Sequence, residues 1–411
     1  MDQREIQDDP RLEKRVRSIL NDVRKRGDEA LIHYTRVLDG IRIPIDKLQV
    51  TRAEIERAYQ RIPQGFLRTL KKAVRRIRGF HQLATPKSIS ALEKGIQLGQ
   101  EIRPLERVAI YVPGGKASYP STVLMAAIPA KVAGVRNIVM TTPPHLEGIS
   151  PAVLVAADLA GVDQIYRVGG AQAIAALAYG TKSIPKVDKI VGPGNRYVAM
   201  AKRLVFGVVD VDMVAGPSEI LVISDGKRSP ACVAADLISQ AEHDESALAV
   251  LLTTSEAFAR KVKSEIEKQL LSLKRRKIAK TSLDGRGAIL VVKDLEQAVE
   301  LANRIAPEHL ELSLSHAFPL LKKIKNAGAV FLGLHTPEAI GAYLAGPNHI
   351  LPPAGTARFS SPLGVEDFMK RINWMGFTNE ALKSFEKDVK RFADWEGLEG
   401  HYRAVQMRLE P

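Results

Sequence analysis

The chain has 411 residues, a length at which more than one packed unit is expected. Its composition, 45% hydrophobic and 26% charged, is typical of globular proteins, and no run of about 18 apolar residues offers a membrane span. The net charge is +14, but the basic residues are spread along the chain without the spacing of a zinc finger or an RNA-binding motif. We therefore expect neither a membrane protein nor a nucleic-acid-binding protein.

The N-terminal sequence and the cysteine content both indicate a reducing compartment. The polar start, MDQREIQDDP, lacks the basic and then apolar pattern of a secretory signal, so we expect a cytoplasmic protein. The single cysteine, Cys232, excludes a disulfide framework and a thiolate metal cluster. It falls in a predicted helix, where a small buried side chain is a simpler interpretation than a nucleophile.

The first part of the chain is predicted to be helical. Apolar residues recur with helical spacing between residues 11 and 82, at Leu12, Val16, Ile19, Leu20 and Val23, and then at Leu67, Leu70, Val74 and Ile77. From Arg107 the pattern changes to short β-branched runs, which alternate with alanine-rich helical stretches: RVAIYV, NIVMTT, QIYRVG and KIVGPGN. This alternation predicts parallel βαβ units.

A second alternating set begins near Glu219 with EILVIS and continues through ALAVLLTTS, GAILVV and AGAVFLG. Two α/β domains are therefore expected. Residues 364–411 are charged and aromatic with a helical pattern, and they are too few to fold alone. We expect this tail to pack on another surface.

Three glycine-rich turns follow predicted strands: YVPGG (Tyr111–Gly115), GGAQ (Gly169–Gln172) and GPGN (Gly192–Asn195). Each lies where main-chain amides and a helix N-terminus can meet a phosphate, although none is the GxGxxG motif. A single glycine-rich turn indicates only a tight bend of the main chain. Three such turns at strand ends indicate a ligand cleft.

Several of the nine histidines have neighbours suited to metal or proton chemistry. Gln240 and His243 are three residues apart on a predicted helix, a spacing that can hold zinc but is more often a surface hydrogen bond. Glu308 and His309 are adjacent and suit acid–base work, or simply end a helix. His349 lies in a Gly/Pro-rich segment, and Glu396 and His401 lie in the tail. The other histidines are interpreted as structural or exposed: His33, His81, His145, His316 and His335.

Taken in order, the segments YVPGG, VGGAQAIAALAYGT, VGPGNRYV, VDMVAGPSEI, ISQAEHD, APEHLEL, AGPNHILPPAGTARFSSPLGVEDF and EGLEGH resemble the histidinol dehydrogenase family over nearly the whole chain. The resemblance implies an α/β fold with two incomplete Rossmann-like α/β/α domains, a helical N-terminal lead-in and a helical C-terminal tail. It also implies a homodimer in which each tail enters the neighbour's active site. The expected segments are 1–106 (lead-in and part of the first α/β domain), 107–218, 219–363 and 364–411.

Site residues follow from the resemblance, motif by motif. Gln240 and His243 resemble zinc ligands, with His401 of the partner subunit completing the site. Glu308 and His309 resemble the family's acid–base pair, and Tyr111, Gln172 and Asn195 lie where the family contacts NAD. The expected substrate contacts are Ser218, Gln240, His243, His309, His349, Glu396 and His401.

The implied reaction is the last part of histidine biosynthesis, in which L-histidinol is oxidised through L-histidinal to L-histidine with two NAD. His309 is expected to remove the alcohol proton, and Glu308 is expected to activate the water that adds to the aldehyde. Zinc, one per subunit, would mainly position the substrate. No thiol nucleophile is required, because Cys232 lies away from every motif.

One position departs from the family pattern. Seven residues before His349, where the family has an aspartate zinc ligand, this chain has Ala342. The remaining ligands are neutral, so weaker zinc binding is expected, unless Glu338 or another carboxylate replaces the missing one or the substrate differs. The alternatives are a related zinc-dependent dehydrogenase of another small amino alcohol or polyol, and a binding protein without catalysis.

Overall fold

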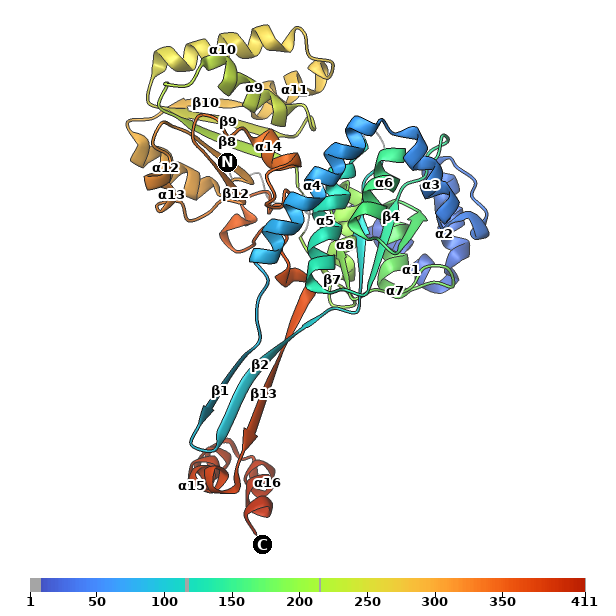
Figure 1. The fold of residues 1–411 in the computed structure, drawn as a ribbon, viewed down its shortest axis with the longest axis vertical. Coiled ribbons are helices and arrows are strands. Elements are labelled where there is room, and N and C mark those ends of the chain that lie inside the picture. The colour runs from blue at the N-terminus through green and yellow to red at the C-terminus, as the bar shows by residue number, and fades with distance from the viewer. Residues whose placement is uncertain (1–8, 115–117, 214–215, 411) are drawn as a thin grey trace. The chain divides into compact units, whose positions relative to one another are not determined.

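The computed structural model describes residues 9–114, 118–213 and 216–410 (Figure 1). They form two compact units. The first unit contains the chain up to Ala84 together with Leu105–Phe368, and the second contains Thr85–Pro104 together with the chain from Met369 onward. Among the described residues, no helix is long and apolar enough to cross a membrane.

The predicted helical lead-in is confirmed. It comprises α1 (Pro10–Arg26), α2 (Asp28–Asp39), α3 (Arg52–Arg61) and α4 (Gln64–Leu83). Asp9 caps α1 by accepting a hydrogen bond from the amide of Leu12, and the apolar stripe of α1 is buried: Val16, Ile19, Leu20 and Val23. Because these helices are amphipathic, they need an apolar surface to cover, and the first sheet's helices provide it.

The first sheet is parallel, with strand order β5-β4-β3-β6-β7. Its strands are β3 (Arg107–Tyr111), β4 (Asn137–Thr142), β5 (Gln164–Arg167), β6 (Lys189–Val191) and β7 (Asp210–Val211). They alternate with α5 (Pro120–Ala133), α6 (Pro151–Ala160), α7 (Gly170–Tyr179) and α8 (Arg196–Val205). Helix α1 packs against α7 and α8, whereas α3 and α4 pack against α5 and α6. The lead-in thus completes the helical layers of this domain.

The second sheet is also parallel, with strand order β10-β9-β8-β11-β12. Its strands are β8 (Glu219–Ser224), β9 (Leu248–Thr253), β10 (Ala288–Val291), β11 (His309–Ser313) and β12 (Ala329–Leu332). The helices are α9 (Pro230–Ala241), α10 (Glu256–Leu270), α11 (Arg276–Arg286), α12 (Leu295–Ile305), α13 (Phe318–Leu321) and α14 (Glu338–Tyr343). Separate apolar clusters cover the two faces of the sheet, one containing residues of α9 and α10 and the other residues of α12. The predicted pair of α/β domains is confirmed.

The second unit contains an antiparallel sheet of β1 (Ile89–Glu93), β2 (Ile96–Pro104) and β13 (Met369–Phe377), followed by α15 (Asn379–Glu396) and α16 (Glu399–Leu409). The helical tail is confirmed for α15 and α16. The helix expected over Met369–Phe377 is wrong, because this segment pairs with β2 along its whole length. Gly99 on β2 makes room for Trp374, since a Cβ there would lie 2.3 Å from the indole ring.

Candidate active site

The predicted acid–base pair, Glu308 and His309, lies at the start of β11, in the interior of the second sheet. His309 is buried, and its Nδ1 donates a 2.9 Å hydrogen bond to the main-chain carbonyl oxygen of Glu219 on β8. A carbonyl oxygen can only accept, so Nδ1 carries the hydrogen and Nε2 has the free lone pair. Burial lowers the pKa of His309 to about 4, so the ring is neutral at physiological pH. This is the state required of a general base.

Glu308 is held by the same residue. Its Oε2 accepts a 2.9 Å hydrogen bond from the amide of Glu219 and lies 3.7 Å from Nδ1 of His309. Burial raises the pKa of Glu308 well above its ordinary value. A carboxylate of raised pKa is a stronger base when it ionises, which suits activation of water.

A third acidic residue faces His309 from the other side. Glu338 begins α14, exposes 7% of its surface, and places Oε1 3.6 Å from Nε2 of His309. Burial, followed by the charge of Asp236, raises the pKa of Glu338 to about 7. The sequence suggests Glu338 only as a substitute zinc ligand, whereas the structure places its carboxylate next to Nε2 of His309.

Ala342 lies one helical turn after Glu338 on α14. Its carbonyl oxygen accepts a 2.7 Å hydrogen bond from Nδ1 of His349, whose pKa is lowered to about 4 by burial. His349 is therefore neutral and presents Nε2, as His309 does. The main chain of Ala342 has a clear role here, whereas its methyl side chain offers no ligand to a metal.

Gln240 lies near the end of α9, and its Oε1 is buried without a hydrogen-bond partner. The prediction that His243 lies on the same helix is wrong in detail, because α9 ends at Ala241. Beyond the end of α9, the side chain of Asp244 accepts a 2.9 Å hydrogen bond from the amide of Ser246, which forms an Asx turn. The amide of His243 still reaches the carbonyl of Gln240 at 3.2 Å.

His243 shares its surroundings with the other two histidines. Burial lowers the pKa of His243, and His243 lies close enough that protonation of its ring would further lower the pKa of His309 and of His349. The structure therefore brings together Gln240, His243, Glu308, His309 and His349. Ser218 directly precedes Glu219, the residue that holds the acid–base pair, and its own carbonyl oxygen accepts a hydrogen bond from Leu248.

The donor set can be compared with the needs of zinc. The unpartnered amide oxygen of Gln240 and the neutral imidazole of His243 are both suitable donors. Over residues 9–114, 118–213 and 216–410, no group of three or more His, Cys, Asp or Glu side chains could hold a metal. The expected third ligand, His401, is exposed on α16 in the second unit, as is Glu396 at the end of α15. The two donors of the first unit fit zinc, but Ala342 leaves them without a carboxylate.

A separate cavity of about 1150 Å³ lies among the glycine-rich turns of the first domain. Its lining contains all three residues expected to contact NAD, Tyr111, Gln172 and Asn195. The hydroxyl of Tyr111 accepts a 3.1 Å hydrogen bond from the amide of Gly170, and Asn195 caps α8 by accepting from the amides of Tyr197 and Val198. The last residue of the first turn, Gly115, lies outside the described residues.

The cavity has features that suit a dinucleotide. The N-termini of α7 and α8 both reach it through Gly170 and Asn195, which are favourable positions for phosphate. Arg15 of α1 and Arg61 of α3 add positive charge. These two arginines were not predicted from the sequence. They lie on the N-terminal helices, and the helical pattern alone does not show that their side chains line a cavity of the first α/β domain.

Comparison with known proteins agrees with these motifs. A family model described as histidinol dehydrogenase matches residues 2–409. The chain belongs to the histidinol dehydrogenase family. Two relatives carrying that name come from Syntrophotalea carbinolica, 55% identical over 97% of this chain and 93% of the relative, and Geobacter sulfurreducens, 54% identical over 97% and 94%.

A solved structure gives the same result for the fold. The crystal structure of histidinol dehydrogenase from Elizabethkingia anophelis superposes with a TM-score of 0.94, at 38% identity, over 99% of this chain and 94% of that one. Membership of the histidinol dehydrogenase family makes this protein an oxidoreductase of histidine biosynthesis. The enzyme class predicted from the motifs is confirmed.

Proposed function

We propose that this enzyme oxidises L-histidinol twice, through L-histidinal to L-histidine, with NAD as the electron acceptor. The observation that carries the proposal is the orientation of Glu308 and His309 by one residue, Glu219, in a chain of this family. The pKa values of the two side chains are shifted in opposite directions, so each can take a different proton during the two oxidations. His309 is neutral near pH 7, while the pKa of Glu308 is raised.

In the first oxidation His309 acts as the base. Its Nε2 takes the proton of the substrate hydroxyl as the carbon loses hydride, which leaves the aldehyde. The resulting imidazolium is stabilised by the hydrogen bond from Nδ1 to Glu219 and by the carboxylate of Glu338, 3.6 Å from Nε2. A desolvated base of this kind keeps its lone pair at every pH above about 4.

In the second oxidation Glu308 acts first. Its carboxylate takes a proton from water as the water oxygen bonds to the aldehyde carbon, and the imidazolium of His309 returns its proton to the aldehyde oxygen. This gives a hydrate and leaves His309 neutral again. His309 then removes a proton from a hydrate hydroxyl as the same carbon loses a second hydride, which leaves the carboxylic acid. The adjacency of Glu308 and His309 allows both proton transfers to occur around one carbon.

NAD, held by Tyr111, Gln172 and Asn195, supplies the acceptor for the hydride in each oxidation. The cavity of about 1150 Å³, the two helix N-termini and the arginines Arg15 and Arg61 support this assignment. Gln172 is fully buried, and neither atom of its amide has a hydrogen-bond partner, so it has unused hydrogen-bonding capacity.

Zinc, held by Gln240 and His243 with His401 of the partner subunit, would position the imidazole and amine of the substrate. Ser218, His349 and Glu396 would contribute further substrate contacts. With Ala342 in place of a carboxylate, the ligands are neutral and do not offset the charge of the ion, so we propose that zinc is bound weakly.

The assembly in this proposal is a homodimer, in which the tail of each subunit completes the site of the other. Three large apolar side chains of α15 and α16 support it, because Trp395, Phe392 and Met407 expose 92%, 70% and 66% of their surface. Such exposure is typical of a surface that another chain covers. The biosynthetic role and the single cysteine favour a reducing location, the cytoplasm.

The direct test is NADH formation from histidinol with added Zn²⁺, comparing the unmodified chain with His309→Gln. We expect the variant to lose at least about 100-fold in kcat, because the general base is gone. His316→Gln is the matched control, since His316 is an exposed histidine of the same domain and should leave the rate unchanged. Equal activity of the His309 variant and the control would refute the assignment.

A further inference from the structure

A fully buried ion pair lies beside the glycine-rich turn that follows β6. Lys202 on α8 and Asp212 after β7 each expose only 1% of the side chain, and Nζ of Lys202 contacts Oδ1 of Asp212. The loss of hydration by two charges costs about as much free energy as their attraction returns. Two apolar side chains of the same volume would stabilise the fold equally well. We therefore look for a role of this ion pair other than stability.

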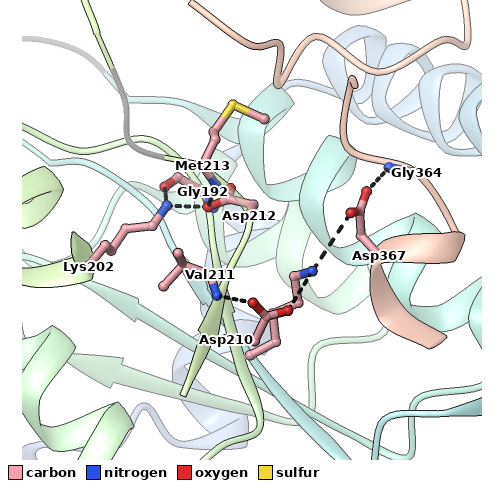
Figure 2. A network of polar contacts seen from close by, with 9 residues as sticks. Gly192, Lys202, Asp210, Val211, Asp212, Met213, Gly364 and Asp367 are labelled. Atoms are coloured by element: carbon pink, nitrogen blue, oxygen red, sulfur yellow. Dashed lines mark hydrogen bonds and ion pairs between the residues drawn. The ribbon is translucent and has the colours of Figure 1, made fainter. Parts of the chain in front are cut away.

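The hydrogen bonds of the pair converge on one residue, Gly192. Nζ of Lys202 donates to its carbonyl oxygen at 3.0 Å, and its amide donates to Oδ2 of Asp212 at 2.7 Å. Oδ1 of Asp212 also accepts from the amide of Met213 at 2.7 Å. Figure 2 shows Lys202 and Asp212 directed toward each other and toward Gly192. Both polar main-chain groups of Gly192 are thus held by charged side chains.

Gly192 is constrained on its other side as well. Its φ is +109°, which side chains with a Cβ rarely adopt, and a Cβ would lie 2.3 Å from the carbonyl oxygen of Tyr111. Three residues later, Asn195 caps α8, the helix that carries Lys202. The ion pair therefore joins the start of the Gly192–Asn195 turn to the helix at its end, and the turn packs against the main chain of Tyr111.

We propose that Lys202 and Asp212 are positioning residues that hold the Gly192–Asn195 turn in the geometry that accepts the nicotinamide dinucleotide. This inference rests on the proposed function, in which Tyr111 and Asn195 contact the cofactor. A turn already held in its bound conformation loses less conformational entropy when a ligand arrives. Without the pair, the turn has to be ordered by the cofactor itself, and affinity for the cofactor falls.

A second lysine in the same domain provides a matched control. Lys189 on β6 exposes 7% of its side chain and pairs with Asp210 at 3.0 Å and with Asp367 at 3.7 Å. Asp367 in turn accepts a 2.7 Å hydrogen bond from the amide of Gly364. Figure 2 includes this neighbouring network. None of these side-chain contacts involves Gly192, so loss of Lys189 removes a buried lysine and its ion pairs with two partly exposed carboxylates without releasing the turn.

The experiment compares Lys202→Met with Lys189→Met in the full-length enzyme. Thermal unfolding, NADH binding by fluorescence titration, and KM and kcat for NAD and histidinol are measured for both. We expect both variants to unfold at lower temperature, but only Lys202→Met to raise the Kd for NADH and the KM for NAD, by about tenfold, with little change in kcat at saturating NAD. Equal NADH affinity in the two variants would overturn the inference.

Asp212→Asn covers the case in which Lys202→Met does not fold. It keeps the side-chain shape and one acceptor for Gly192 but removes the charge, so we expect a smaller loss of NADH affinity, of about threefold. Unchanged affinity in this variant would also contradict the inference. Failure of the proposed function has a different signature, because the unmodified enzyme would then neither bind NADH nor oxidise histidinol.

Discussion

The amide of Glu219 donates to the carboxylate of Glu308, while its carbonyl oxygen accepts from the imidazole of His309, both at 2.9 Å. One residue at the start of β8 therefore orients both members of the proposed acid–base pair. It also sets the tautomer of His309, with Nδ1 protonated and Nε2 basic. The register between β8 and β11, which places His309 opposite Ile220, brings about this arrangement.

Glu338 should contribute to the pH dependence of the reaction. In the proposed reaction its carboxylate stabilises the imidazolium of His309. Burial raises the pKa of Glu338 to about 7, so its negative charge appears as the pH rises through about 7. We expect kcat to increase over this interval, and Glu338→Gln to remove the increase and lower kcat by about tenfold. The measurement is kcat at saturating substrates from about pH 6 to about pH 9. An unchanged profile in the variant would exclude this role for Glu338.

Glu311 should make the fold less stable in alkaline solution. This buried residue of β11 has its pKa raised to about 9, first by burial and then by the charge of Asp236. Because the folded pKa exceeds the unfolded one, its contribution to stability is full below about pH 4.5 and is lost as the pH rises toward about 9. We expect Glu311→Gln to raise the Tm relative to the unmodified enzyme near pH 9, with a smaller difference near pH 5.

An exposed residue provides the control for that measurement. Glu267→Gln on α10 removes the same charge from a solvated position and should leave the Tm nearly unchanged at both pH values. If both variants shift the Tm equally, net charge explains the effect and burial of Glu311 does not.

Ala342→Asp should restore a carboxylate to the metal site. We expect zinc to survive dialysis better, by metal analysis, and histidinol oxidation to depend less on added Zn²⁺, because an anionic ligand offsets the charge of the ion. Ala342→Asn is the isosteric control without charge and should have a much smaller effect. Retention of one tightly held zinc per subunit by the unmodified chain would show that another group completes the site.

The shared site of the homodimer can be tested by complementation. His309→Ala and His401→Ala subunits should each form inactive dimers, but a mixed dimer contains one site with both histidines intact. After denaturation and refolding of an equal mixture, we expect about a quarter of the unmodified activity if association is random. Complete inactivity of the mixture would show that His401 does not act across the interface.

The sequence predicts most of the fold, because most of its helices and strands have a clear hydrophobic periodicity within their own residues. Alternating β-branched and alanine-rich segments predict both parallel sheets, and amphipathic spacing predicts the lead-in. The strand β13 was missed because its partner, β2, lies more than 260 residues earlier in the chain, from Ile96 to Pro104. Pairing over such a separation leaves no signal in either segment alone.

The sequence proposes site residues where residue type carries the chemistry, and the structure brings five of them together: Gln240, His243, Glu308, His309 and His349. The orienting role of the main chain could not be predicted, because any residue except proline at position 219 would supply the amide and carbonyl that contact Glu308 and His309. The role of Lys202 was hidden for another reason. A lysine on a helix suggests a solvated side chain, and only the tertiary structure buries it against Asp212.

The proposed reaction is a four-electron oxidation of histidinol by NAD, and the amount of NADH formed from a limiting amount of histidinol tests it. The reaction is run to completion with excess NAD and added Zn²⁺, and the product is identified by chromatography. We expect two NADH and one histidine for each histidinol. One NADH with accumulation of the aldehyde, or no NADH at all, would contradict the proposed reaction.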